Sequence, residues 1–234
     1  EHLVSLGGRE ANTPRELAAL CDIVHLCVTG SPQVEALLRG PDGVVASSKA
    51  GLIVIDCSTS NPVSTLALGE ELKAKGMILV DAPLSRTPKE AEEGTLDTMV
   101  GADPATFARI EPVLRLWAGN VVHLGPLGLG HKMKLINNFV AMGYAALFAE
   151  ALAIARKAGL SVEQFHSVLG SGRMRSGFYD TFISTAVSDI SGTVASVGAR
   201  LMEGTARKLT EQFWIKFAAS ISEEADTIMD VYEP

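Results

Sequence analysis

The sequence predicts an α/β domain with a mainly parallel sheet, followed by an all-helical domain. From residue 14 to about residue 125, short apolar strands alternate with helical stretches, an order typical of a parallel sheet with helices on its faces. After Gly130 no strand pattern returns with any strength. We therefore expect the α/β domain to cover residues 1–129 and the helical domain to cover residues 130–234, joined by one long helix.

The elements of the α/β domain follow from apolar runs and from helix start and stop signals. Proline begins four helical stretches, at the first position where its missing N–H is tolerated. Gly76 is a helix stop, and Asp56 ends a strand that is otherwise fully apolar. The expected strands are 22–28, 52–56, 77–81, 97–101 and 121–124, and the expected helices are 14–20, 32–38, 62–75 and 104–116.

The helical domain is expected to start with one continuous helix over residues 131–158. Its apolar positions are too dense for a surface helix with a single apolar side, so we expect much of it to be buried. Gly159 ends this helix, and Ser161 with Gln164 forms a capping box for a further helix over 162–169.

Composition and charge indicate a small-molecule partner. The chain has 234 residues, enough to bury a real core, and its net charge is -7. A negative net charge argues against a general affinity for nucleic acid or for an anionic membrane surface. We find no uninterrupted run of about 18 apolar residues and no export signal at the start, so we expect neither a membrane span nor secretion.

The three cysteines give no sign of a metal site. Cys21, Cys27 and Cys57 are widely spaced, form no CxxC pair and have no histidine at zinc-ligand spacing. Cysteines in or beside apolar strands are most often small core residues. We therefore expect core thiols, no bound metal and a reducing, cytoplasmic environment.

A helical face in the segment 128–138 carries candidate chemistry. Lys134, Asn137 and Asn138 are spaced i, i+3 and i+4, which puts one amine and two carboxamides on one side of a helix. Burial would lower the pKa of the lysine towards that of a proton donor to a carbonyl, and an asparagine amide can hold a substrate carbonyl or carboxyl group. The alternative is a solvated lysine with asparagines that face water. The local sequence supports both interpretations equally.

Polar residues follow the two strands that end in aspartate, at the sheet edge where ligands bind in open α/β folds. After the first strand come Ser58 and Thr59, whose hydroxyls either contact a cofactor or belong to a turn that caps the next helix. After the second come Ser85, Arg86 and Thr87. A serine hydroxyl can bind a carboxylate and an arginine can clamp an anion; the alternative is a surface arginine in a polar turn.

The glycine-rich turn before the lysine helix is a poor dinucleotide-binding fingerprint. Gly128 and Gly130 precede a helix, but Met133 stands where GxGxxG needs a third glycine for close helix packing. A sharp turn and a close approach of the backbone to another element explain these glycines better than a phosphate cradle.

The histidines form no catalytic pattern. His25, His123 and His166 stand alone, so we expect core or surface side chains there. His131 precedes Lys134 closely enough to line the same cleft, but the sequence gives it no role.

From about residue 22 to residue 158 the chain resembles the β-hydroxyacid dehydrogenase family, the relatives of 3-hydroxyisobutyrate dehydrogenase. Four motifs occur in the order of that family. Asp56-Cys-Ser58-Thr59 is similar to its DxST strand end, Asp81-Ala-Pro83-Leu-Ser85 to its DAPVS segment, Gly94-Thr-Leu-Asp-Thr-Met-Val-Gly101 to its GTL…VGG stretch, and Gly128 to Asn138 to its GxGxxxKxxNN helix start.

The resemblance implies a Rossmann-like domain and a hydride exchange between NAD or NADP and a small hydroxy or oxo acid. Lys134 would then be the general acid or base. Asn138, with Asn137 beside it, would hold the substrate, and Ser85 would bind its carboxylate. Ser58 and Thr59 would lie near the cofactor. The helical domains of the family pack against a second subunit, so a homodimer or homotetramer is expected.

Three departures from the family pattern qualify this. The family's glycine-rich loop lies in a first βαβ unit that would precede Glu1, so we expect a domain that lacks this unit and its grip on the cofactor pyrophosphate. Arg86 and Thr87 replace a pair of glycines, and members with arginine there, such as sulfolactaldehyde reductase, imply a strongly anionic or longer acid. After about Phe182 the family's C-terminal helices cannot be aligned, and no role is carried over.

Two functions remain open at this point. The first is an NAD(P)-dependent dehydrogenase or reductase of a small hydroxy or oxo acid. The second is a non-catalytic remnant that serves oligomerisation or binding. We favour the first, because four ordered motifs are stronger support than any one of them.

Overall fold

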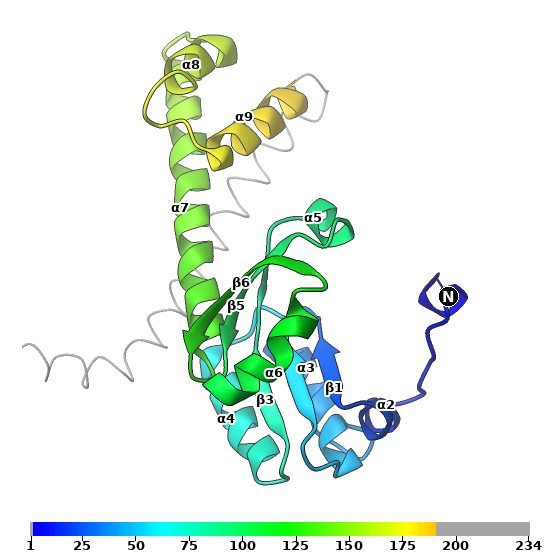
Figure 1. The fold of residues 1–234 in the computed structure, drawn as a ribbon. Helices are drawn as coiled ribbons and strands as arrows, with labels where there is room; N and C mark the ends of the chain where they lie inside the picture. Colours follow the sequence, from blue (N-terminus) through cyan, green and yellow to red (C-terminus); the bar gives the residue numbers. More distant parts are fainter. Residues whose placement is uncertain (1, 191–234) are drawn as a thin grey trace, which may run out of the picture. The chain divides into compact units, whose positions relative to one another are not determined.

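The computed structural model describes residues 2–190 of the chain (Figure 1). The strands are β1 Ile23–Leu26, β2 Ile53–Asp56, β3 Ile78–Asp81, β4 Leu84–Ser85, β5 Leu96–Gly101 and β6 Ala118–Gly125. The helices are α1 His2–Ser5, α2 Pro14–Leu20, α3 Ser31–Leu38, the 3-10 helix η1 Val44–Ser47, α4 Pro62–Lys73, α5 Pro88–Glu92, α6 Pro104–Leu114, α7 Leu129–Lys157, α8 Val162–Leu169 and α9 Gly177–Ile190.

The predicted fold class, an α/β sheet domain followed through a long helix by a helical domain, is confirmed. Two compact units divide between Ile136 and Asn137, inside α7, whereas the sequence suggested a boundary near Leu129. Each unit is described by itself below. The predicted domain 130–234 extends past residue 190, so its last part lies outside the described residues.

The sheet is mostly parallel. Its strand order is β1-β2-β3-β5-β4, and β6 also pairs with β5. The strands β1, β2 and β3 run parallel to one another. The strands β5 and β6 are parallel to each other, but β5 is antiparallel to both β3 and β4. In the register of β2 and β3, Asp56 pairs with Asp81. The chain segments that follow these two strands therefore leave the sheet at the same edge.

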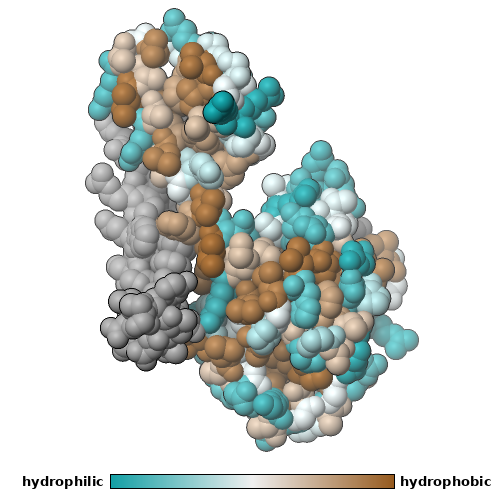
Figure 2. All heavy atoms as spheres, turned by 60° about the vertical axis from the view of Figure 1, so that its left-hand side comes forward, coloured by the Kyte–Doolittle hydropathy of each residue, from teal (hydrophilic) through white to brown (hydrophobic). Residues whose placement is uncertain are grey.

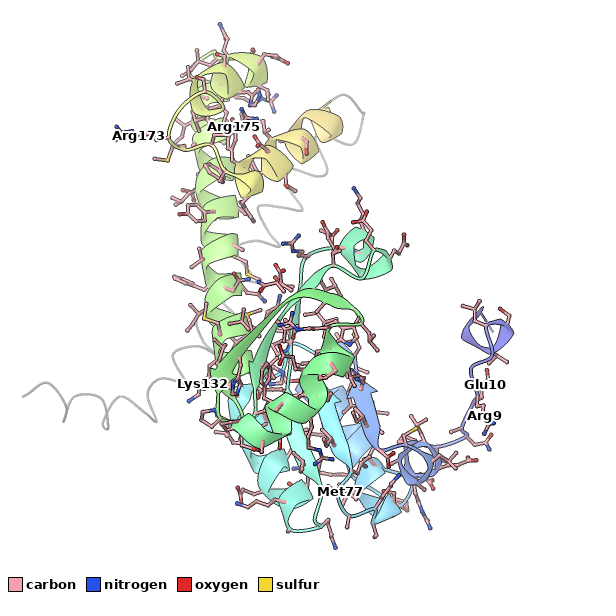
Figure 3. All side chains as sticks on the ribbon, in the orientation of Figure 1. Arg9, Glu10, Met77, Lys132, Arg173 and Arg175 are labelled. Carbon is pink, nitrogen blue, oxygen red and sulfur yellow. The ribbon has the colours of Figure 1, made fainter. Side chains whose placement is uncertain are left out.

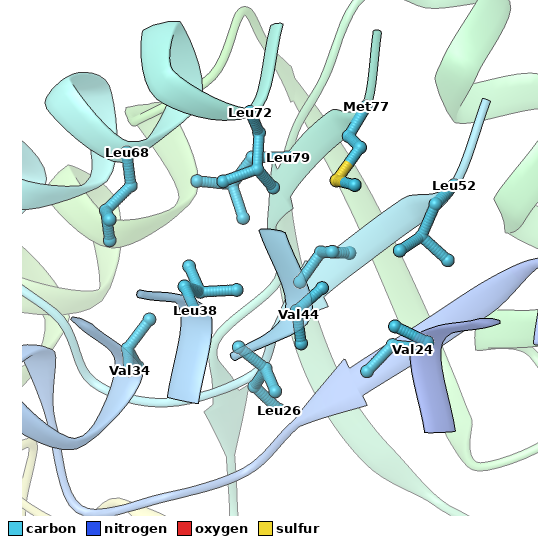
Figure 4. Packing of buried hydrophobic residues seen from close by; sticks show 12 residues of the cluster. Val24, Leu26, Val34, Leu38, Val44, Leu52, Leu68, Leu72, Met77 and Leu79 are labelled. Atoms are coloured by element: carbon cyan, nitrogen blue, oxygen red, sulfur yellow. The ribbon is translucent and has the colours of Figure 1, made fainter. Parts of the chain in front are cut away.

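Helices cover both faces of this sheet. Strand β2 contributes Val54 to one buried layer and Ile53 and Ile55 to the other, which explains why its sequence is apolar without alternation. Figure 4 shows the first layer, in which side chains of α3, α4 and η1 pack on the strands. The second layer packs Ile110 and Leu114 of α6 against the opposite face.

The helical unit has a small core of its own. It is formed by one face of α7 together with α8 and α9, and Tyr179 is fully buried at its centre. The predicted capping box is present, because the Ser161 hydroxyl accepts the Gln164 N–H while the Gln164 side chain accepts the Ser161 N–H. The core side chains are Phe148, Leu152, Ala155, Val162, Phe165, Tyr179 and Ile183.

The expectation that much of α7 is buried is wrong for the described structure. Ile136, Tyr144, Leu147 and Ile154 are all exposed, and Figure 2 shows apolar side chains at the surface of the helical unit. The described core is too small to cover the whole circumference of a 29-residue helix. By length and composition alone α7 could cross a membrane, a test that core helices of soluble proteins also pass. The absence of a membrane span stays a prediction.

Five described elements were not expected, namely α1, η1, β4, α5 and α9. Strand β4 has only two residues, and α5 has five, so neither carries a periodic pattern. Helix α9 follows a stretch rich in serine, glycine and arginine, which favours a loop.

The cysteine prediction is correct only in part. Cys57 is buried in the sheet core, and burial raises the pKa of its thiol. Cys21 is half-buried. Cys27 is exposed, because Cys27 directly follows Leu26, the last residue of β1, where the chain leaves the sheet. All three are free thiols.

Candidate active site

The carboxylate of Asp81 joins the sheet to the start of α7. Its Oδ1 accepts the N–H of Gly128 and its Oδ2 accepts the N–H of His131, each at 2.7 Å. These N–H groups belong to the unpaired donors at a helix start, so Asp81 caps α7 from about 50 residues upstream. Burial raises the pKa of Asp81, and the neighbouring His131 and the two N–H donors oppose that shift. A carboxylate in this place both satisfies the helix start and ties it to β3.

Glycines make this close approach possible. A Cβ on Gly130 would lie far inside contact distance of the Met99 carbonyl oxygen and 2.9 Å from Asp81 Oδ2. A Cβ on Gly101 would likewise collide with the Asp81 carboxylate. Gly128 has a φ of +93°, in the left-handed region. The expected turn and close approach are thus present, and the amides of Gly128 and His131 are taken up by Asp81.

His131 lies fully buried beside this carboxylate. Its Nε2 faces the carbonyl oxygen of Ser58 at 3.1 Å, and its Nδ1 faces the hydroxyl of Thr65 at 2.8 Å. The ring therefore connects the first turn of α7 both to the segment after β2 and to α4.

The segment after β2 is held from three sides. The Asp56 carboxylate accepts the N–H of Ser58 at 2.9 Å and the hydroxyl of Ser60 at 2.7 Å. The Ser58 hydroxyl accepts the N–H of Val28, which follows β1, at 3.0 Å. Ser58 is buried by these contacts, whereas Thr59 is exposed at the same turn. Of the two expected cofactor contacts, Thr59 is the accessible side chain.

The segment after β3 runs beside it. The N–H of Ala82 donates to the Asp56 carbonyl oxygen at 2.8 Å, and the N–H of Leu84 to that of Cys57 at 3.3 Å. From β5, the buried Thr98 hydroxyl donates to the carbonyl oxygen of Ala82 at 3.0 Å. Ser85, half-buried at the end of β4, is thus placed on a segment that is fixed on both sides.

Arg86 has an unusual backbone. Its φ of +87° is in the region that favours glycine, in agreement with the glycines that the family has here. Its Nε donates to Asp97 Oδ2 at 2.8 Å, and half of the side chain remains exposed. A positive φ at a non-glycine residue is backbone strain that the surrounding contacts have to hold in place.

Thr87 has a local partner instead. It is the N-cap of α5, and its hydroxyl donates to Glu90 in a capping box. The capping box, which the sequence pattern T-x-x-E signals, accounts for this residue without a ligand.

Lys134 lies one turn after the anchored start of α7. It is half-buried, and this burial lowers the pKa of its amine. Lys134 is therefore less solvated than a lysine that faces water, and its role stays a prediction.

Asn137 and Asn138 belong to the second unit. Helix α7 runs through both residues, as their spacing predicts, and both are half-buried. In the same unit Arg173 and Arg175 project from the loop between α8 and α9 (Figure 3), and Arg175 pairs with Asp180.

Within residues 2–190, no three His, Cys, Asp or Glu side chains are grouped to hold a metal ion.

Sequence reasoning missed the two residues at the centre of this edge. Asp81 was quoted within a motif without a role, and His131 was given none. The available signal was that Asp81 ends a strand directly before a proline turn, while two glycines and a histidine open the following long helix. Nothing in the sequence pairs residues that are about 50 positions apart.

Comparison with known proteins shows which protein families have this fold. Residues 1–125 match the family model of the NAD binding domain of 6-phosphogluconate dehydrogenase. Residues 128–190 match the model described as NAD-binding of NADP-dependent 3-hydroxyisobutyrate dehydrogenase. The fold is thus that of a nicotinamide-dependent oxidoreductase.

Individual similar proteins indicate which family of nicotinamide-dependent oxidoreductases the chain resembles. The chain is 36% identical over 174 residues to 2-(hydroxymethyl)glutarate dehydrogenase of Eubacterium barkeri, covering 74% of this chain and 58% of the relative. It is 33% identical to 2-hydroxy-3-oxopropionate reductase of Escherichia coli, covering 74% and 59%. The solved structure of Mycobacterium tuberculosis 3-hydroxyisobutyrate dehydrogenase with L-serine is 29% identical, with a TM-score of 0.65 over 72% of this chain and 57% of that one.

The chain belongs to the β-hydroxyacid dehydrogenase family. It spans less than two thirds of the length of these relatives. Within the described residues, Thr59 offers an accessible hydroxyl at the sheet edge for NAD or NADP. The N–H groups of Gly128 and His131 already donate to Asp81, so they do not form a phosphate cradle.

Replacement of Gly130 by alanine tests the close approach. We expect Gly130→Ala to lower the free energy of unfolding by about 1–3 kcal/mol, because the added methyl group meets backbone on β5. Gly143→Ala is the matched control on the same helix. A Cβ there meets nothing within 4 Å, so alanine should stabilise by about 0.5–1 kcal/mol. Chemical denaturation measures both, and equal effects would contradict the assignment.

Proposed function

We propose that this protein is an NAD(P)-dependent oxidoreductase that interconverts a small hydroxy acid and the corresponding oxo acid or semialdehyde. The observation that carries the proposal is the hydrogen bonding that joins all four motifs at one sheet edge. Ser58 contacts His131, Asp81 contacts the start of α7, and Thr98 holds the segment that leads to Ser85. Four motifs distant in sequence would not converge there by chance.

NAD or NADP, when bound, supplies or accepts the hydride in this proposal. Thr59 and the backbone around Ser58 would hold its nicotinamide end. The hydroxyl of Ser58 is not assigned to the cofactor, because it already accepts the N–H of Val28. The buried contacts of Asp56 keep this turn in place without a ligand. The cofactor would therefore meet a preformed edge.

Lys134 would move the proton. In the reduction direction its ammonium group donates a proton to the carbonyl oxygen, and in the oxidation direction its neutral amine removes the hydroxyl proton. A lowered pKa makes both forms accessible nearer to neutral pH than for a solvated lysine. The anchored helix start keeps the amine in a constant place while it changes charge.

The substrate would be a small anion. Ser85 offers a hydroxyl, and Arg86 offers a guanidinium with half of its surface free. Asn138, with Asn137, would hold the substrate. The names of the similar proteins, which refer to glutarate and oxopropionate compounds, agree with a carboxylate. With Arg86 present, we favour a strongly anionic or longer acid.

Oligomerisation and cellular location complete the proposal. We propose a homodimer or homotetramer in the cytoplasm, without nucleic-acid or membrane partners. The exposed apolar side chains of α7 support association with a further surface. The free thiols support a reducing compartment.

The alternative is a non-catalytic remnant that serves oligomerisation or binding. Its support is the same exposed face of α7. Calorimetric titration of the 234-residue chain with NADH and NADPH separates the two. Tight binding of either would argue against the remnant, and no binding of either would favour it.

Removal of the Lys134 amine tests the proton transfer. We expect Lys134→Met to reduce turnover by about 10²–10⁴-fold without lowering thermal stability, because an apolar side chain suits this half-buried site. Lys157→Met, in the last turn of the same helix, should retain activity. In wild type, reduction should slow as the pH rises through the lowered pKa of Lys134, and oxidation should speed up. Full activity of Lys134→Met would refute the role.

Replacement of Arg86 by glycine separates strain from substrate binding. Glycine adopts the positive φ freely, so Arg86→Gly should stabilise the fold or leave it unchanged. The same change should raise KM for the acid about tenfold or more, because one charge-assisted contact is lost. The control Arg115→Gln removes an exposed arginine that pairs with Glu111 and should not change KM. An unchanged KM in Arg86→Gly would exclude Arg86 from the substrate site.

A further inference from the structure

The proposed function leaves the most buried polar cluster of the first unit without a role. The side chains of His131 and Asp81 are fully buried, and that of Asp56 is 2% exposed. The imidazole lies between the two carboxylates, with Nε2 3.7 Å from Asp56 Oδ2 and Nδ1 3.8 Å from Asp81 Oδ2. One acid comes from β2, the other from β3, and α4 adds the uncharged Thr65.

Hydrogen bonding fixes one ring nitrogen as a donor. Nε2 faces the Ser58 carbonyl oxygen at 3.1 Å, and a carbonyl oxygen can only accept. His131 therefore binds Ser58 through an N–H group. Its own backbone N–H is held by Asp81. The residue is thus fixed at both its backbone and its side chain.

The same ring lies next to the proposed proton donor along the helix. Lys134 follows His131 by three residues, so both side chains lie on neighbouring turns of one face of α7. At its other end, the ring contacts the Ser58–Thr59 turn, which the proposed function places beside the nicotinamide. His131 thus links these two parts of the site, through its hydrogen bond to Ser58 and through its place on α7.

We propose that His131 is a positioning residue, which sets the place of Lys134 relative to the Ser58–Thr59 turn through its Nε2 hydrogen bond and does not contact the substrate. The inference rests on the proposed role of Lys134. It predicts a loss in kcat with little change in KM, because a small misplacement of a proton donor acts on the chemical step.

Two conservative variants test the hydrogen bond itself. His131→Gln keeps an amide donor near the position of Nε2, whereas His131→Asn is shorter and reaches only towards Thr65. We expect His131→Asn to lower kcat about 100-fold with KM within about threefold, and His131→Gln to recover to within about tenfold of wild type. Equal losses in both variants would overturn the inference, because a merely structural residue would not separate them.

The matched control is His123 on β6. It is half-buried, and its Nε2 contacts a carbonyl oxygen, that of Ala102, at 2.7 Å, but it lies outside the four motifs. His123→Asn should leave kcat within about twofold of wild type, since general loss of a buried histidine contact is not what lowers turnover. A loss as large as that of His131→Asn would overturn the inference.

A double mutant tests whether His131 acts through Lys134. If it does, His131→Asn should cause no further loss of residual turnover in a Lys134→Met background. A further loss of about 100-fold would show an independent role and overturn the inference.

A measurement without cofactor or turnover distinguishes failure of this inference from failure of the proposed function. The pKa of Lys134 can be followed in the cofactor-free protein by carbon-13 NMR of its Cε. In His131→Asn it should rise towards that of a solvated lysine, and in His131→Gln it should stay near the wild-type value. An unchanged pKa in His131→Asn overturns the positioning role. Full turnover of Lys134→Met instead overturns the proposed function.

Discussion

The buried carboxylate of Asp81 is the contact on which the arrangement of the first unit depends. It ends β3, and it accepts two N–H groups from the first turn of a helix that begins about 50 residues later. A buried carboxylate is tolerated only when its oxygens are satisfied, and the start of a helix needs an acceptor. Each therefore meets the requirement of the other. Gly101 and Gly130 allow the two to approach, because a Cβ at either position would collide with Asp81, and Gly128 adopts the positive φ of the turn before the helix.

Other features of the edge follow from this contact. With α7 fixed to β3, the ring of His131 reaches the turn after β2, and Lys134 is held one turn further along the helix. The segment with Ser85 is fixed by backbone contacts to β2 and by Thr98 of β5. Contacts within the chain order these groups, which is the preorganisation that the proposed proton transfer would require.

Much of this fold was accessible from the sequence. The apolar run of β2, the prolines that open α2, α4 and α6, and the capping box of α8 are local signals, and the structure contains each of them. The four motifs are also local signals, and hydrogen bonds bring them together at one sheet edge. What the sequence does not show is which distant residues pair. Asp81 with α7, and His131 with Ser58, are contacts between elements far apart in the chain.

The role of Thr87 in substrate binding stays a prediction, and its hydroxyl already has a local partner in the capping box with Glu90. The expectation that much of α7 is buried was wrong for a physical reason. Its sequence is apolar on most sides, and such a surface needs packing partners, but the sequence does not show which element supplies them. Within the described residues, the side chains of Ile136, Leu147 and Ile154 remain exposed.

Hydrogen exchange at the start of α7 tests the central claim most directly. In Asp81→Asn, one side-chain oxygen must serve two N–H donors, so exchange of the Gly128 and His131 amides should accelerate about 10- to 100-fold relative to wild type. Asp103→Asn is the control, because asparagine is also a good cap for α6 and should leave these amides protected. Unchanged protection of Gly128 and His131 in Asp81→Asn would contradict the account.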